Sequence, residues 1–207
     1  AQLRQAQEAF VQVEKLGRSE GAVNQARVLQ AEGSLDEAAE ALQRASQMDP
    51  PPVPWTFAWL SGEIARQQGQ FLEAEKNFRS VLYDRTEERR KRNFDFSLDY
   101  VVRNQLGATL IDMADQAESR GNRTRAKELL DAAKNEFQIV LRTDSENNTA
   151  HANLRDLFGR LSDYSEDAKE RETLLAQAEF HGKANLKYKP DDNAANVARP
   201  EAKKKYP

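Results

Sequence analysis

Apolar residues recur along this chain at helical spacing, and short breaks containing Gly or Pro separate the apolar stretches. The stretch from Ala31 to Pro50 shows this pattern most clearly. Within it, Ala38, Leu42 and Ala45 follow one another at intervals of four and three residues, which places them along one face of a helix. Gly33 before this face predicts a left-handed turn, and the closing Pro cannot continue a helix. The stretch therefore predicts a turn followed by a complete helix.

The residue types in this stretch indicate how the helix packs. Two of the three residues on its apolar face are Ala, so a second helix can approach closely there. Ser34 and Glu37 stand three residues apart at its start, a spacing that predicts a capping box. The stretch is therefore typical of the second helix of an antiparallel helix pair.

The same pattern returns later in the chain. Gly33 and Gly69 are 36 residues apart, and so are Ala38 and Ala74. A period of this length is typical of helical repeat proteins. We therefore predict an all-α fold, an α-solenoid of antiparallel helix pairs. Its expected parts are a half-repeat at 1–17, repeats at about 19–52, 55–84, 97–145 and 148–190, and a basic tail at 194–207.

The spacing widens in the third repeat. Relative to a regular unit it holds about 14 surplus residues, which predicts about two additional turns in each of its two helices. The fourth repeat is also expected to have lengthened helices. Between the second and third repeats, residues 87–96 suit a solvated connector, with Phe96 packed near a helix that Ser97 caps. A docking loop is the alternative for this connector.

These units resemble the tetratricopeptide repeat, a helix–turn–helix of about 34 residues with small residues at set positions. Ala26, Ala38, Ala45 and Pro50 match that pattern in the first repeat, and Leu106-Gly107 match it in the third. The resemblance implies a superhelix whose first helices line a binding groove. The groove candidates that it implies are Arg27, Trp59, Glu63, Arg66, Asn104, Asp112, Asp156 and Arg160.

Composition is consistent with a thin, elongated core. Charged residues make up 31% of the chain and hydrophobic residues 39%, because each repeat packs only on its neighbours. The net charge of −3 does not favour nucleic acid as a partner. A nucleic-acid adaptor that uses Arg89 to Arg92 and the Lys-rich tail remains a rival hypothesis. No apolar run reaches the length of roughly 18 residues that a membrane span needs, so none is expected.

No pattern in the sequence predicts catalysis. The chain has no Cys and only two His residues, His151 and His181, and neither belongs to a metal-binding motif. His151 is expected to pack in the core. The sequence contains no Gly-rich phosphate loop and no nucleophile motif, and its acidic residues are expected on solvent-facing helical positions. We therefore predict a protein that is not an enzyme and needs no cofactor.

A second, shorter resemblance concerns the end of the chain. Tyr188 to Ala194, together with Phe94 to Ser97, are similar to repeat modules at the C-terminal end of bacterial multihaem c-type cytochrome proteins. That resemblance implies an accessory domain of a larger redox enzyme whose catalytic part lies outside this chain, in a periplasmic or extracellular location. Without it, a cytoplasmic location is expected.

The leading hypothesis is a scaffold that binds a peptide, a partner subunit or another copy of itself. A repeat array that starts on a half-unit exposes an apolar helix face, so residues 1–17 are expected to contact an upstream domain or a second copy. Such a start also suggests a piece of a larger protein. The interface candidates are Phe10, Val13, Leu16, Phe94 and Phe96.

Overall fold

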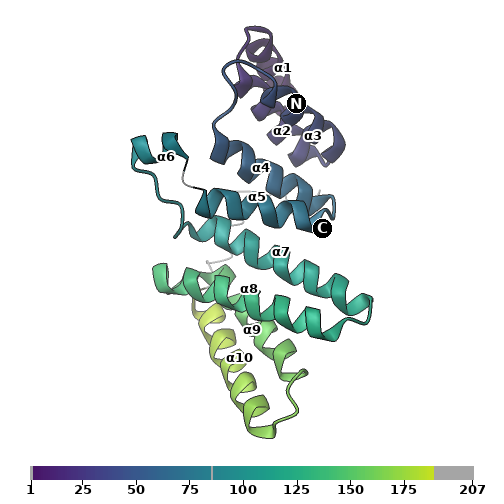
Figure 1. Ribbon diagram of the computed structural model, residues 1–207, viewed down its shortest axis with the longest axis vertical. Helices are drawn as coiled ribbons and strands as arrows, with labels where there is room; N and C mark the ends of the chain where they lie inside the picture. Colours follow the sequence, from purple (N-terminus) through teal and green to yellow (C-terminus); the bar gives the residue numbers. More distant parts are fainter. Residues whose placement is uncertain (1, 85, 189–207) are drawn as a thin grey trace. The chain divides into compact units, whose positions relative to one another are not determined.

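The computed structural model describes residues 2–84 and 86–188, and within them every regular element is a helix (Figure 1). The helices are α1 Gln2–Lys15, α2 Ser19–Glu32, α3 Leu35–Ser46, α4 Pro54–Gln67, α5 Phe71–Tyr83, α6 Glu87–Arg92, α7 Tyr100–Ser119, α8 Arg123–Thr143, α9 Asn148–Ser162 and α10 Ala168–Tyr188. Consecutive long helices form the pairs α2–α3, α4–α5, α7–α8 and α9–α10. The predicted all-α arrangement of helix pairs is confirmed.

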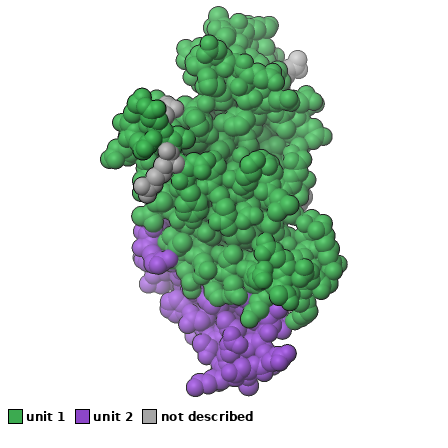
Figure 2. All heavy atoms as spheres, in the orientation of Figure 1, with its two compact units in different colours: residues 1–139 green, residues 140–207 purple. Residues whose placement is uncertain are grey.

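The chain divides into two compact units, residues 1–139 and residues 140–207, which Figure 2 colours separately. The first unit contains α1 to α7 and most of α8. The second unit contains the end of α8 with α9 and α10. The predicted basic tail at 194–207, and residues 189–194 of the second resemblance, lie outside the described residues.

In two of the helix pairs, the two helices of the pair touch where a glycine on one faces a phenylalanine ring on the other. A Cβ atom added to Gly62 on α4 would lie 2.8 Å from the ring of Phe78 on α5. A Cβ atom added to Gly107 on α7 would lie 2.6 Å from the ring of Phe137 on α8. Both rings are fully buried. Because these distances are shorter than a carbon–carbon contact, only glycine lets the paired helices come this close.

Alanines have the same role in the first helix pair. Ala26 on α2 and Ala38 on α3 are fully buried in one core cluster with Leu42 and Ala45. Ala74, the counterpart of Ala38 on α5, is also fully buried. The small residues that the repeat pattern singled out therefore lie where helices pack against each other.

The predicted turn at Gly33 is confirmed and recurs in the next two pairs, but the predicted capping box is not confirmed. Gly33, Gly69 and Gly121 have φ angles of 83°, 75° and 75°, and each lies between the two helices of a pair. Ser34 stands at the N-cap of α3, yet its side chain makes no capping hydrogen bond. Its ψ of 67° is unlike the extended backbone of most N-cap residues. The glycine turn positions this helix without a side-chain cap.

The lengthened third repeat is confirmed. Helices α7 and α8 have 20 and 21 residues, against 14 and 13 in α4 and α5. Both helices of the third pair are therefore longer by about two turns. In the fourth pair only α10 is long, with 21 residues, whereas α9 has an ordinary 15. The expectation that both helices of the fourth repeat are lengthened is wrong for α9.

The connector between the second and third pairs is more ordered than a solvated linker. Residues 87–92 form the short helix α6, which stands to one side of α5 and α7 in Figure 1. Ser97 does not cap the next helix. Asp99 does, since its carboxylate accepts hydrogen bonds from the backbone N–H groups of Val101 and Val102, each at 3.0 Å. A carboxylate here also suits the positive end of the helix dipole.

Glu136 is buried, contrary to the expectation that the acidic side chains face solvent. Glu136 on α8 is 8% exposed and forms an ion pair with Arg103 on α7, which is 4% exposed. The Nε of Arg103 also donates to the carbonyl oxygen of Ser97 at 2.6 Å. A buried carboxylate needs such a partner, because unpaired burial of a charge is strongly unfavourable. The pair therefore specifies how α7 and α8 pack.

In the second unit, two histidines join α9 to α10. The Nδ1 atoms of His151 and His181 are 2.8 Å apart, and both rings are buried. The Nε2 of His151 lies 3.1 Å from the carbonyl oxygen of Ser145, which can only accept, so this nitrogen carries the hydrogen. His181 must then donate from Nδ1 to His151. The predicted packing role of His151 is confirmed, and its partner is the only other histidine of the chain.

We predict that Gly107→Ala destabilises the chain by about 1–3 kcal/mol, because the new methyl group overlaps the buried ring of Phe137. Gly159 on α9 provides the matched control, since a Cβ there meets nothing within 4 Å. Gly159→Ala should stabilise its helix by up to about 1 kcal/mol. Thermal and urea unfolding of both variants measures the difference, and equal effects of the two substitutions would contradict the packing described.

The α9–α10 pair is expected to weaken in mild acid. Burial, followed by the neighbouring His151, lowers the pKa of His181 from 6.5 to about 4. Between these values the unfolded chain binds a proton that the folded chain does not, so the free energy of unfolding falls as pH falls from 6.5 to 4. Hydrogen exchange of the α9 and α10 amides at pH 7 and pH 5 measures this. His181→Phe should remove the part of the pH dependence that this histidine causes, and an unchanged dependence would exclude it as the source.

Candidate functional site

The first helices of three successive pairs lie next to one another in the first unit. Helix α4 contacts both α2 and α7. Six of the groove candidates stand on these helices: Arg27 on α2, Trp59, Glu63 and Arg66 on α4, and Asn104 and Asp112 on α7. We call this set of six residues the first-helix face. It contains one aromatic side chain, two cations and two carboxylates.

Polar contacts join α4 to α7 across this face. The Nε of Arg66 donates to the Oδ2 of Asp112 at 2.7 Å, and its Nη1 donates to the Oε1 of Gln105 at 3.3 Å. Gln105 in turn donates from Nε2 to the Oε1 of Glu63 at 3.4 Å. Glu63 and Arg66, about one turn apart on α4, therefore share Gln105 as a partner on α7, which fixes the register between the two helices.

Glu63 lies at the centre of this network. Burial raises the pKa of its carboxyl group, while a hydrogen bond with Gln30 and the positive charges of Arg27 and Arg66 act in the opposite direction. The side chain thus interacts with groups on α2, α4 and α7. Its charge is balanced within the face, so a ligand meets a polar surface with little net charge.

Trp59 is the aromatic centre of the face. The guanidinium carbon of Arg27 lies 5.9 Å from the centre of its ring, within the range of a cation–π contact. The ring is half-buried, and its Nε1–H is buried with no acceptor among the described residues. Buried N–H groups of this kind usually have an acceptor. The Trp59 side chain therefore brings an unsatisfied hydrogen-bond donor to the first-helix face.

The other two groove candidates lie in the second unit, on α9. Asp156 is exposed, and the Nε of its neighbour Arg155 donates to its carboxylate at 2.6 Å. Arg160 is half-buried. The first-helix face is therefore described only through α2, α4 and α7.

The candidate interface on α1 is partly covered. Helix α1 packs on α2 at Gly21, where an added Cβ would lie 2.3 Å from the backbone nitrogen of Glu14. Phe10 and Val13 are half-buried, whereas Leu16 is 79% exposed. A hydrogen bond from Arg44 on α3, 2.9 Å long, lowers the pKa of Glu14 and ties α1 to the first pair. A contact of this helix with a further domain or a second copy stays a prediction.

Phe94 and Phe96, the other interface candidates, cluster with Trp55. The centre of the Trp55 ring lies 5.5 Å from that of Phe94 and 5.7 Å from that of Phe96. Phe94 keeps 46% of its surface exposed. The connector thus folds back on the start of α4 and presents an aromatic side chain outward.

Sequence reasoning missed the residues that complete these contacts. Gln105 precedes Asp112 by seven residues and so shares its face of α7, and Gln30 follows Arg27 by three on α2. This spacing could have identified both. Arg89 on α6 is buried, with 4% of its surface exposed, and no spacing in the sequence indicates this burial, because it depends on how the connector folds.

None of the helices within residues 2–84 and 86–188 is both long and apolar enough to cross a membrane. Over the same residues, no group of three or more His, Asp or Glu side chains is placed to hold a metal ion. Neither the comparison with protein-family models nor the comparison with curated proteins finds a match for this chain.

The Arg66–Asp112 pair is predicted to couple α4 to α7 by about 1 kcal/mol in a double-mutant cycle of the two alanine variants. The side chains are 32% and 28% exposed, so solvent screens the pair only partly. The Arg125–Glu128 pair within α8, whose side chains are 52% and 59% exposed, is the matched control and should couple by no more than about 0.5 kcal/mol. Urea unfolding of both sets measures the coupling, and equal values would show that the pair adds nothing between helices.

Proposed function

We propose that the chain is a non-catalytic scaffold that binds an extended segment of a partner protein across the first-helix face. The observation that carries this proposal is Trp59, with a half-buried ring and an N–H group that no described residue satisfies. An extended peptide supplies backbone carbonyl acceptors together with apolar side chains. Trp and Arg are also the residues that contribute most binding energy at protein interfaces.

The internal pairing of the face supports binding by a preformed surface. Glu63, Arg66 and Asp112 have partners on neighbouring helices, so their side chains are held before a ligand arrives. A surface ordered in advance loses less side-chain entropy on binding. Because the charges are balanced, recognition by this face depends on hydrogen bonds and on Trp59 more than on the ligand's net charge.

We also propose that the chain is a member of the tetratricopeptide repeat family. The glycines and alanines at the meeting points of paired helices, and the ordinary lengths of α4 and α5, support this assignment. In this assignment the first-helix face corresponds to the groove by which the family binds its partners. Leu16, which follows α1 and is 79% exposed, supports a second contact beside α1.

Selection from a library of random 12-residue peptides displayed on phage tests the proposal. We expect the immobilised chain to enrich peptides whose affinity falls at least tenfold in Trp59→Ala or Arg27→Ala. Arg27 is exposed and contributes little to the core, so its removal should leave the fold intact. Fluorescence anisotropy with the selected peptides gives the dissociation constants.

Arg125→Ala is the matched control for Arg27→Ala. It removes another exposed arginine that forms a hydrogen bond with a side chain three residues away on its own helix, but on α8 and not on the first-helix face. Its affinity for the selected peptides should equal that of the unaltered chain. If no enriched peptide distinguishes Arg27→Ala from Arg125→Ala, the first-helix face is not the binding surface.

A further inference from the structure

A second surface in the first unit gathers exposed apolar side chains around α6. Tyr83 at the end of α5 is 47% exposed, and Phe94 after α6 is 46% exposed. Leu98, Tyr100 and Val101, which lead into α7, are 57%, 46% and 44% exposed. Tyr83 and Phe94 line the same pocket, and exposed apolar side chains that adjoin one another are typical of an interaction surface. We call these five residues with α6 the α6 surface.

This surface contains a pocket of about 300 Å³. Tyr83 and Phe94 supply apolar parts of its wall, and Arg89, Arg90 and Asn93 supply hydrogen-bond donors. The pocket therefore combines positive charge with aromatic rings. That combination suits a ligand that presents an anionic group beside an apolar one.

Arg89 is the buried cation of this wall, with 4% of its surface exposed. Its Nη1 donates to the carbonyl oxygens of Asp84 and Ser80 at the end of α5, and its guanidinium carbon lies 4.8 Å from the centre of the Phe96 ring. Its Nε–H is buried and has no acceptor among the described residues. The carbonyl groups do not neutralise the charge, so the wall keeps a full positive charge and an unused donor.

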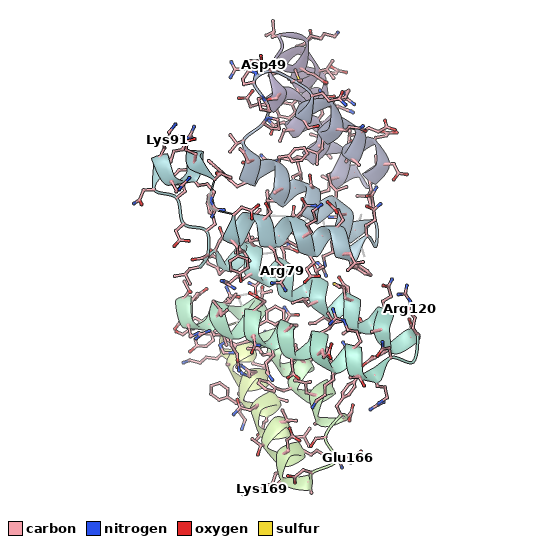
Figure 3. The ribbon with its side chains drawn as sticks, in the orientation of Figure 1. Asp49, Arg79, Lys91, Arg120, Glu166 and Lys169 are labelled. Carbon is pink, nitrogen blue, oxygen red and sulfur yellow. The ribbon has the colours of Figure 1, made fainter. Side chains whose placement is uncertain are left out.

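Three acidic side chains around the pocket accept hydrogen bonds from groups that are close to them in sequence. Asp99 caps α7, the Oδ1 of Asp95 accepts from the backbone N–H of Ser97 at 2.8 Å, and Asp84 accepts from the hydroxyl of Ser80 at 2.6 Å. In contrast, Arg90 is exposed, whereas Lys91, which Figure 3 labels on α6, is exposed but forms an ion pair with Glu87 at 2.9 Å. The wall of the pocket therefore has a net positive charge, from Arg89 and Arg90 against the single carboxylate of Asp95.

We propose that the α6 surface binds an acidic segment of a partner protein that carries an aromatic or leucine side chain next to its carboxylates. A carboxylate enters the pocket and accepts hydrogen bonds from Arg89 and Arg90, since guanidinium groups match the two oxygens of a carboxylate. The adjacent apolar side chain packs on Tyr83 and Phe94. This surface differs from the first-helix face, where charges are balanced between helices and Trp59 is the central residue.

The test uses the same phage library of random 12-residue peptides, with counter-selection against the double variant Arg90→Glu, Phe94→Ser. Both residues are exposed and neither belongs to the buried core, so these changes should leave the helix pairs intact. We expect the retained peptides to be rich in Asp or Glu beside Phe, Trp, Tyr or Leu. Their affinity, measured by fluorescence anisotropy, should be at least tenfold lower for the double variant than for the unaltered chain. Their affinity for the unaltered chain should also fall as the salt concentration rises.

The matched control makes the same two chemical changes elsewhere. Arg125→Glu, Leu72→Ser alters an exposed arginine and a leucine that is 74% exposed, and it should not change the affinity. Trp59→Ala should also leave these peptides bound, which separates this surface from the first-helix face. If only Trp59→Ala weakens the peptides, the α6 surface is not the binding site.

Three further results would overturn the proposal. The first is a set of selected peptides without acidic residues, or no peptide that distinguishes the double variant. The second is binding of a 20-nucleotide oligothymidylate that is tighter than peptide binding and that the double variant loses, which would assign the surface to nucleic acid. The third is a solution mass that shows a dimer of the unaltered chain and a monomer of the double variant, which would assign the surface to a second copy.

Discussion

The close contact between a glycine on one helix and a phenylalanine ring on its partner, at Gly62 and at Gly107, is the constraint on which the second and third helix pairs depend. Each glycine lets the facing helix place a fully buried phenylalanine ring against the backbone. A close approach of this kind brings many atoms into contact and fixes both the spacing and the register of the pair. The alanines of the first pair give a similar approach with smaller partners. Without these small residues, the apolar stripes of paired helices could not reach each other.

Contacts between α4 and α7, the first helices of successive pairs, include a polar network. The close approach of paired helices at Gly62 and Gly107 is apolar, whereas α4 and α7 are joined by polar groups such as Arg66, Asp112 and Gln105. Polar contacts require specific partners in specific geometry, so they define which helices are neighbours as well as how closely they lie. A surface built this way is ordered yet remains hydrophilic enough to face water, which suits the binding role proposed for it.

Arginines organise the junction between the second and third pairs. Arg89 uses carbonyl oxygens at the end of α5, and Arg103 joins Glu136, Ser97 and the hydroxyl of Tyr83. The last carbonyls of a helix have no partner within it, so a cation there satisfies both hydrogen bonding and the helix dipole. These two side chains hold the connector in a defined shape. The aromatic and basic groups of the α6 surface are therefore presented in a fixed arrangement.

Periodicity in the sequence alone determined the paired helices, the glycine turn after the first of them and the lengthened third pair, but not the short helix α6, because the former depend on interactions within a few residues of chain. It also identified the helices on which Arg27, Trp59, Glu63 and Arg66 stand. Only the tertiary structure decided that Glu136 is buried, that Arg89 turns inward and that Asp99, not Ser97, caps α7. The Arg103–Glu136 and His151–His181 contacts join residues 33 and 30 positions apart. Contacts at that separation depend on which helix faces which, and the local pattern of apolar and polar residues does not contain that information.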